Sequence, residues 1–320
     1  MAGLPRADVL KARRRLAAAQ HVAVVSHERP DGDAVGSLLA LSLALRAAGK
    51  RVDAILPDGL PSRFRFLPGA TTVVREPAAG AELLVTVDCS TLERLGRPGG
   101  LVPAVNIDHH PTNTLFATIN LIDARAAATA EILSDLLPSL GLSIDADIAT
   151  NLLAGIVTDT IGFRTVSTTP RLLRLAAELM ERGAPLAEVY DRALNQHNLS
   201  ALRYWGLGLG RLEERRGVVW SSLRLDDRRA AGYRGNDDAD LINLLGTIEE
   251  ARVALVFVEQ TGGRTKVSWR SRAGINVARL AEAFGGGGHD LAAGAMLGGE
   301  HEAIVQAVIE ATLAVLKGTA

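Results

Sequence analysis

The first half of the chain alternates short apolar runs with longer stretches of helical character. The runs HVAVVS, RVDAIL, ELLVTVD, PAVNID and ATINLI have the length and β-branched content that are typical of strands. Residues 34–48, 131–140 and 146–157 have the spacing and length of helices. Strands that are apolar on both faces and alternate with helices indicate a parallel sheet covered by helices. The pattern therefore predicts a doubly wound, mostly parallel α/β domain.

A purely helical pattern follows from Pro170 to about Glu214. Its first part, TPRLLRLAAELMERG, opens with a threonine cap and a proline in the first turn. Three strand-like runs come next, GVVWSSLRL, ARVALVFVEQ and RTKVSWRS, and a glycine hairpin turn at residues 262–263 joins the last two. Helices are expected around residues 276–283 and 301–316. These elements predict a second, smaller α/β domain with a mixed sheet.

Length and composition agree with this division. A chain of 320 residues exceeds the size at which one hydrophobic core stops growing. The opening, MAGLPRADVLKARRRLAAA, has no long apolar core, and polar residues interrupt the stretch 34–48, so neither a signal peptide nor a membrane span is predicted. We expect a cytoplasmic protein without membrane attachment. Its expected parts are an N-terminal domain, a helical connector and a C-terminal domain over residues 1–185, 186–214 and 215–320.

Cysteine content and charge restrict the chemistry. Cys89 is the only cysteine, so the chain has neither an intramolecular disulfide nor a thiolate cluster for a soft metal. Any metal site must use oxygen and imidazole ligands. With a net charge of -1, the chain lacks the excess of positive charge that is expected of a protein that coats long nucleic acid. A short anionic substrate in a local pocket remains compatible with this charge.

Acidic and imidazole residues follow several of the predicted elements. A Pro-Asp-Gly turn alone would explain the acidic loop after the first strand. However, similar residues follow other strands, and the carboxyl ends of strands in an open parallel sheet converge on one crevice. The sequence thus predicts that these residues meet in space. They are His27, Asp31, Asp33, Asp88, Asp108, His109, His110 and Asp159.

At least four carboxylates in one crevice would repel one another and raise each other's pKa, so a compensating positive charge is required. No cluster of arginine or lysine adjoins the motifs, which leaves metal cations. The ligands exceed what one tetrahedral ion needs, and oxygen with imidazole favours Mn²⁺ or Mg²⁺ over structural zinc. Two such ions, bridged by a carboxylate and a hydroxide, form an arrangement that serves phosphoester hydrolysis.

The same residues carry a resemblance. HERPDGDAVGS, VTVDCS, IDHHPTN and GIVTDTIGFRT resemble the four successive motifs of the DHH phosphoesterase superfamily, named for an Asp-His-His found here at 108–110. The segment SWRSRAGINVARLAEAFGGGGHDLAAGAML resembles the DHH-associated C-terminal domain. Within the superfamily, the chain is similar to the stand-alone bacterial nano-RNase and pAp phosphatase group. The resemblance covers nearly the whole chain.

The resemblance implies two metal ions that share Asp88 as a bridging ligand. It also implies that His110 faces the substrate phosphate and that Asp108 orients a neighbouring histidine. Arg164 matches the family pattern and is expected near the phosphate, although a surface ion pair would explain it equally well. The other ligands expected are His27 and Asp31 for the first ion, and Asp33, His109 and Asp159 for the second.

A glycine run in the C-terminal half is the candidate anion site. Residues 285–288 could form only a flexible turn, but the run precedes a histidine and follows RSR, and glycine lets backbone N–H groups approach an anion closely. Arg270 and Arg272 share one face of the predicted strand, and the family match favours Arg272. The residues expected to bind a substrate phosphate or terminal nucleotide are Arg272, Gly286, Gly287, Gly288 and His289.

The resemblance thus implies a Mn²⁺-dependent hydrolase of phosphoester bonds, with Mg²⁺ as the other candidate ion, that acts by hydroxide attack between two metals. Expected substrates are very short RNAs and linear dinucleotides, together with the 3′-phosphate of adenosine 3′,5′-bisphosphate (pAp). A homodimer is suggested by the family alone. The alternatives are a cyclic-dinucleotide phosphodiesterase, an inorganic pyrophosphatase of the same superfamily, and a non-catalytic nucleotide-binding sensor. The complete set of expected ligands favours an enzyme over the sensor.

Overall fold

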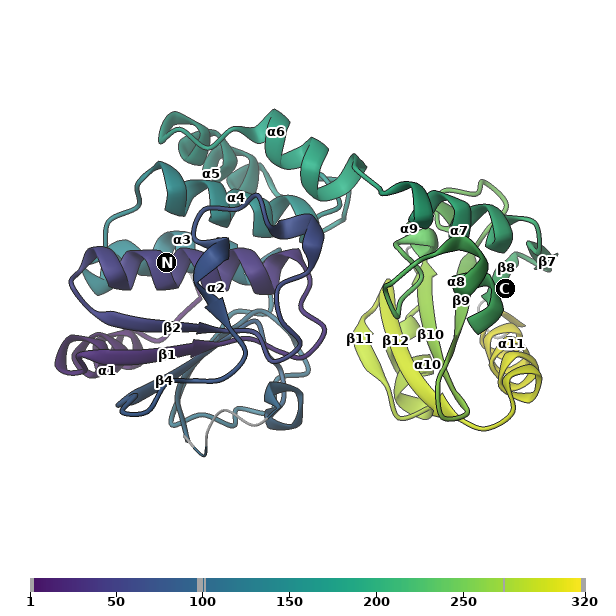
Figure 1. The fold of residues 1–320 in the computed structure, drawn as a ribbon, viewed down its shortest axis with the longest axis horizontal. Helices are drawn as coiled ribbons and strands as arrows, with labels where there is room; N and C mark the ends of the chain where they lie inside the picture. Colours follow the sequence, from purple (N-terminus) through teal and green to yellow (C-terminus); the bar gives the residue numbers. More distant parts are fainter. Residues whose placement is uncertain (1–2, 97–99, 101, 273, 318–320) are drawn as a thin grey trace. The chain divides into compact units, whose positions relative to one another are not determined.

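The computed structural model describes residues 3–96, 100, 102–272 and 274–317. The chain divides into two compact units, Met1–Gln196 and His197–Ala320, and each is described by itself (Figure 1). The finer division at residues 185 and 214 stays a prediction.

The first unit is built on a six-stranded, all-parallel sheet. Its strand order is β3-β2-β1-β4-β5-β6, so the direction of winding reverses between β1 and β4. This order confirms the predicted doubly wound α/β class, and the reversal opens a crevice at the carboxyl ends of β1 and β4. The strands are β1 (His21–Val25), β2 (Arg51–Ile55), β3 (Val73–Val74), β4 (Leu83–Val87), β5 (Pro103–Asp108) and β6 (Ile119–Ile122).

Helices of the first unit pack mainly on one face of this sheet, where they build the larger core. Figure 1 shows α2 and α4 on the same side of β1, β2 and β4. The opposite face has a small core that includes Ile55, Leu84, Cys89 and Leu95. The helices are α1 (Arg6–Ala18), α2 (Gly32–Ala47), α3 (Thr129–Leu140), α4 (Ala146–Asp159), α5 (Pro170–Glu181) and α6 (Leu186–Tyr190), with short turns η1 (Ser62–Phe64), η2 (Ala70–Thr72), η3 (Leu92–Leu95) and η4 (Asp191–Asn195).

Helix α2 is apolar on all sides because it lies between the sheet and α4. Thirteen of its 16 residues are buried. Gly36 allows the close approach, since a Cβ atom there would lie 2.4 Å from the carbonyl oxygen of Asn151. The helix is therefore a core element, as predicted. Across the described ranges, no helix combines the length and the apolar character that crossing a membrane requires.

The second unit has a mixed sheet in the order β11-β12-β10-β9-β8-β7, in which only the β8–β9 pair is parallel among the described strands. Helices α10 and α11 pack on one face and α7, α8 and α9 on the other. The mixed sheet confirms the second predicted architecture. The elements are α7 (Leu199–Leu209), β7 (Glu213–Arg215), β8 (Val218–Leu223), α8 (Leu225–Ala231), α9 (Leu241–Leu245), β9 (Val253–Gln260), β10 (Arg264–Ser271), α10 (Val277–Ala283), β11 (Gly287–His289), β12 (Ala292–Gly298) and α11 (His301–Lys317).

Local predictions succeeded where turn and cap chemistry is strong. Thr169 caps α5 by accepting from the Leu172 N–H, and the turn between β9 and β10 has a positive φ at both Gly262 and Gly263. The purely helical reading up to Glu214 was wrong at its end, where Glu213–Arg215 forms β7. This short edge strand is fully exposed, so it lacks the alternation of apolar and polar residues by which a strand is recognised.

Candidate metal centre

Three loops and one helix end place the predicted ligands at the carboxyl edge of the first sheet. His27 and Asp31 lie in the loop after β1, and the Asp31 carboxylate also caps α2 by accepting from the Ala34 N–H at 3.0 Å. Asp88 follows β4 with a φ of +53°, a left-handed conformation that is uncommon for a residue with a side chain. Asp159 ends α4. The edge of the sheet thus gathers residues that are far apart in the sequence.

A first group consists of His27, Asp31 and Asp88, whose candidate ligand atoms all lie within 4.8 Å of one another. The Nε2 atom of His27 is 3.6 Å from Oδ2 of Asp88. The Nδ1 atom lies 2.8 Å from the backbone carbonyl oxygen of Glu28. When Nδ1 carries the proton it donates to this carbonyl, which leaves the Nε2 lone pair directed at the carboxylate.

A second group consists of Asp33, His109 and Asp159. The Nε2 atom of His109 lies 3.9 Å from Oδ2 of Asp33 and 3.5 Å from Oδ2 of Asp159. It is also 3.6 Å from Oδ1 of Asp88. One oxygen of the Asp88 carboxylate therefore faces each group. The residues in these two groups are the same residues that the sequence analysis expects as ligands of the two ions.

The spacing within these groups fits bound cations. Separations of 3.5–3.9 Å between nitrogen and oxygen are too long for hydrogen bonds. Ligands that each lie about 2.1 Å from a shared ion have such separations at ordinary coordination angles. The donors are carboxylate oxygens and imidazole nitrogens, which suit divalent ions of the Mn²⁺ and Mg²⁺ kind.

Electrostatics at this edge also require positive charge. Burial, together with the neighbouring Asp88 and Asp159 carboxylates, raises the pKa of Asp33 well above its ordinary value. Burial alone would raise the pKa of Asp88 as well, but the nearby His27, His110 and His109 rings hold that pKa far below its usual range. The site thus keeps the Asp88 carboxylate ionised and makes the ionisation of Asp33 unfavourable. A bound cation would stabilise both carboxylates in their charged form.

The N-terminal end of α3 holds two of these carboxylates. Asp33 accepts hydrogen bonds from the backbone N–H groups of Thr129 (2.6 Å) and Ala130 (3.0 Å). The Thr129 hydroxyl donates to Oδ1 of Asp88 at 2.9 Å. Gly155 on α4 leaves the space that Asp33 needs, since a Cβ atom there would lie 2.6 Å from its Oδ1. The sequence analysis missed Thr129 because no motif marks it.

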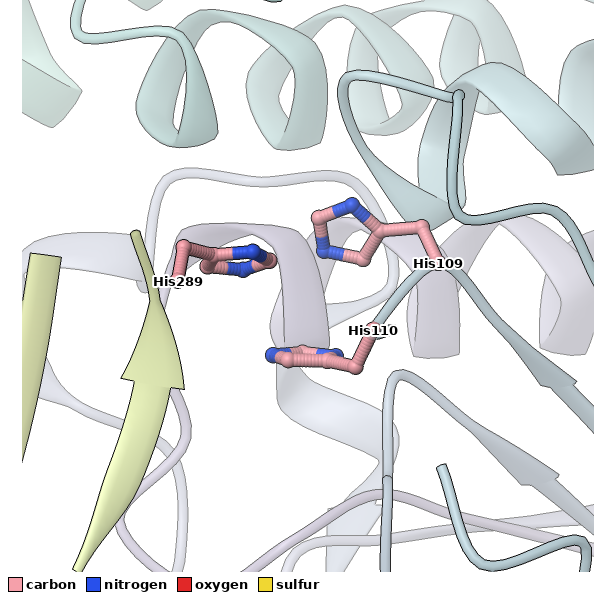
Figure 2. Close-up of side chains that lie close together, drawn as sticks. All are labelled: His109, His110 and His289. Atoms are coloured by element: carbon pink, nitrogen blue, oxygen red, sulfur yellow. The ribbon is translucent and has the colours of Figure 1, made fainter. Parts of the chain in front are cut away.

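Asp108 orients the paired histidines. Its Oδ1 accepts from the His109 backbone N–H at 2.8 Å and lies 2.7 Å from Nδ1 of His110. Its Oδ2 accepts from the Asn113 amide at 2.6 Å. Burial would lower the pKa of His110, but the hydrogen bond to Asp108 and the charge of Asp88 raise it to about 9. Figure 2 shows the His109 and His110 rings projecting from the end of β5, and their centroids are 4.7 Å apart.

Two arginines of the first unit concern the candidate site, one expected from the sequence and one not. Arg164 lies in the turn after α4 with an exposed side chain. Arg94, which the sequence analysis did not select, places its Nη2 atom 3.0 Å from Nδ1 of His27. The Arg94 carbonyl also accepts from the Glu28 N–H at 2.7 Å, which ties η3 to the metal-binding loop. One cation therefore adjoins the motifs after all, although a single arginine cannot balance four carboxylates.

In the second unit the last two residues of the glycine run, Gly287 and Gly288, belong to an edge strand, β11, while Gly285 lies in the turn after α10. A Cβ atom at Gly286 would lie 2.2 Å from the Gly294 carbonyl oxygen, so close packing on β12 itself requires glycine there. His289, whose ring is the third one drawn in Figure 2, ends β11. Arg272 donates from Nη2 to the Ile248 carbonyl at 2.7 Å. The substrate-binding roles of these residues stay predictions.

Comparison with known proteins agrees with this geometry. Residues 21–156 match the DHH family N-terminal domain, and residues 229–316 match the DHHA1 domain. A protein of Thermus thermophilus, named bifunctional oligoribonuclease and PAP phosphatase NrnA, is 38% identical over 90% of this chain and 89% of its own length. The chain belongs to the DHH family.

Further proteins extend the comparison. The Bacillus subtilis protein with the same name is 28% identical over 85% of this chain and 87% of its own length. A crystal structure of an exopolyphosphatase-related protein from Bacteroides fragilis has a TM-score of 0.88 and 25% identity, and the match covers 97% of this chain and 96% of that one. The RecJ structure in complex with Mn²⁺ from Thermus thermophilus has a TM-score of 0.56 at 18% identity, over 97% of this chain and 55% of that one, and shares the fold.

Proposed function

We propose that this protein is a metal-dependent hydrolase that cleaves very short oligoribonucleotides and linear dinucleotides to mononucleotides and removes the 3′-phosphate of pAp. The observation that carries the proposal is the pair of ligand groups that share Asp88. Relatives that align over nearly their full length and are named oligoribonuclease and PAP phosphatase support the choice of substrate. The DHHA1 match counts against a pyrophosphatase, for which we expect another C-terminal domain.

The proposed ligands are those that the two groups contain. His27, Asp31 and Asp88 would hold one divalent ion, and Asp33, His109 and Asp159, with Asp88 shared, would hold the other. Such ions would stabilise negative charge on a phosphoryl group and supply a nucleophile near neutral pH. We propose Mn²⁺ as the preferred ion, with Mg²⁺ as the second choice, because the donors are oxygen and imidazole.

Other residues of the chain would position the substrate. Asp108 binds Nδ1 of His110 and so fixes the ring, which leaves Nε2 to donate to a phosphate oxygen. Arg164 is proposed to contact the same phosphate. The DHHA1 unit would bind the terminal nucleotide through Arg272, Gly286, Gly287, Gly288 and His289. A homodimer without membrane attachment, located in the cytoplasm, completes the proposal.

A chromatographic time course tests this function. Purified protein with Mn²⁺ is offered RNAs of two to five nucleotides, pAp, linear and cyclic dinucleotides, and pyrophosphate in parallel, with EDTA as the control. We expect metal-dependent release of mononucleotides from the short RNAs and of phosphate from pAp. Preferred cleavage of cyclic dinucleotides or of pyrophosphate would contradict the proposal and identify the protein as a cyclic-dinucleotide phosphodiesterase or a pyrophosphatase. Binding without turnover of any substrate would make it a sensor.

A further inference from the structure

A surface cavity lies in the first unit, and none of the proposed metal ligands lines it. It has a volume of about 390 Å³ and is lined by residues of the turn after β2, of the segment before β3 and of β3 itself. The polar residues at its lining are Asp58, Arg65, Thr71 and Arg75, all of which are exposed. No motif of the sequence analysis includes these residues. The volume is within the range of small-molecule sites.

The charges of this cavity are unbalanced. Among the described residues, neither the Arg65 nor the Arg75 guanidinium has a hydrogen-bond or ion-pair partner. By contrast, Arg46 nearby donates to Thr72 and Val52. Two guanidinium groups therefore face one carboxylate. Because guanidinium groups bind phosphate with several directed hydrogen bonds, two of them beside one carboxylate give this cavity the chemistry to bind an anion.

The backbone holds one of the two arginines in place. Gly59 has a φ of +82° in the turn that follows β2, where its N–H donates to the Leu56 carbonyl at 2.8 Å. A Cβ atom at Gly59 would lie 3.1–3.4 Å from Nη2, Nε and Cζ of Arg75. These nearly equal distances mean that the guanidinium plane lies flat on the glycine. Glycine at position 59 therefore leaves the space that the Arg75 guanidinium occupies.

The cavity is connected to the metal-binding loop. Oδ2 of Asp58 accepts from the Arg29 backbone N–H at 2.7 Å, and Arg29 lies in the loop between His27 and Asp31. Strand β2 is the direct neighbour of β1, and β3 is the next strand, so the cavity lies about 5 to 10 Å sideways from the end of β1. One nucleotide unit can span this distance.

We infer that this cavity binds a second phosphate group of the substrate, one nucleotide unit away from the phosphate at the metal centre. The inference rests on the proposed function and deepens it, because it selects nucleotides with two phosphates over those with one. In pAp the occupant would be the 5′-phosphate. Arg65 and Arg75 would provide the charge, and the Thr71 hydroxyl a further donor.

Calorimetric titration of EDTA-treated protein with pAp and with 3′-AMP tests the inference without turnover. Wild type is compared with Arg65→Ala, Arg75→Ala, the double variant, and Arg174→Ala, a control at an exposed arginine of α5. We expect the double variant to bind pAp at least about tenfold more weakly, while its affinity for 3′-AMP stays within about twofold. Arg174→Ala should match wild type. Equal affinity of wild type and the double variant for pAp, or no binding of pAp by wild type, would overturn the inference.

Turnover of the same two nucleotides in Mn²⁺ separates this inference from the proposed function. The double variant should raise KM for pAp at least about tenfold and leave KM for 3′-AMP unchanged. Wild-type turnover combined with equal KM values in the double variant would overturn the cavity's role and leave the function standing. If wild type hydrolyses no nucleotide, the proposed function fails, and the titration alone decides whether the cavity binds phosphate.

Discussion

Both units bury aspartate side chains, but they surround them with different partners. In the second unit, Asp227 accepts from Nη2 of Arg211 at 2.8 Å and from the Arg224 N–H at 2.8 Å. Asp238 accepts from the Ile242 N–H at 3.0 Å. In the first unit, the buried Asp88 accepts from the Thr129 hydroxyl at 2.9 Å and also faces three imidazole nitrogens at 3.6–3.7 Å.

This difference separates structural carboxylates from functional ones. A carboxylate that receives hydrogen bonds from an arginine or from a backbone N–H stabilises the fold by itself. Carboxylates that stand just beyond hydrogen-bond distance from imidazoles leave room for another atom. Neither burial nor the presence of a donor identifies a site by itself, because Asp33 also accepts from two backbone N–H groups. What marks the site is a group of carboxylate oxygens and imidazole nitrogens that lie 3.5–3.9 Å apart. The comparison can be tested by removing carboxylates of each kind.

Asp88→Ala should have the largest effect on activity. The change removes the ligand that both groups share, so turnover should fall at least about 1,000-fold while the far-ultraviolet circular dichroism spectrum stays that of wild type. Turnover of short RNA in Mn²⁺ is the measurement. Asp227→Ala is the matched control and should retain turnover within about twofold. If Asp88→Ala retained turnover near the wild-type value, the assignment of two metal ions that share Asp88 would be wrong.

Metal addition should stabilise the first unit by a smaller amount. A divalent ion at 100 times its dissociation constant raises the free energy of unfolding by about 2.7 kcal/mol if it binds only the folded chain. Thermal unfolding with EDTA and with increasing Mn²⁺ measures this gain. Asp227→Ala should keep the gain and Asp88→Ala should lose most of it. An equal gain in both variants would place the ions elsewhere.

Asp227→Ala should lower the free energy of unfolding by about 1–2 kcal/mol, because it leaves Arg211 and a helix cap without their acceptor. The hydrogen bonds and charges of Arg211 and Arg224 overcome the effect of burial and lower the pKa of Asp227. Its stabilisation is therefore complete above the unfolded pKa of about 3.9 and is lost as the pH falls through the lower folded pKa. Urea unfolding between pH 7 and pH 3 should show the two proteins converge in acid. A constant gap would contradict the pairing.

Asp238→Asn should have the smallest effect, and in the opposite direction. Burial raises the pKa of Asp238, so between about pH 3.9 and the folded pKa the folded chain keeps a proton that the unfolded chain releases. Wild-type stability falls as the pH rises through that window. Asparagine keeps an oxygen for the Ile242 N–H and should gain up to about 1 kcal/mol at pH 7 and less at pH 4. Loss of stability at both pH values would show that the carboxylate is satisfied.

The sequence predicted the fold best where the residues of a single helix or strand have a clear hydrophobic pattern. All strands of the first sheet except the two-residue β3 correspond to predicted apolar runs. The loops that carry the ligands follow β1, β4 and β5 directly, so the parallel topology predicts that these loops lie close together. Helix α1 was not predicted because charged residues interrupt its apolar positions and it buries only Val9, Ala12 and Leu16. Strand β11 was hidden by its glycines.

Contacts between segments without periodicity could not be read from the chain. Thr129 reaches Asp88 only because α3 begins beside the sheet edge, and Arg94 reaches His27 through a short 3₁₀ turn. Arg65 and Arg75 are ten residues apart and share a cavity only after the segment between them has folded. Such residues depend on tertiary structure, which local patterns do not record.

The left-handed backbone at Asp88 has a consequence for protein engineering. Glycine adopts this conformation at little cost and asparagine more readily than most residues, so either would relax the turn after β4. A variant library selected only for heat resistance should therefore enrich glycine and asparagine at position 88. The selected variants would unfold at a higher temperature but would lack the carboxylate that the two proposed ions share. A stability screen on this protein therefore needs to be combined with an activity screen.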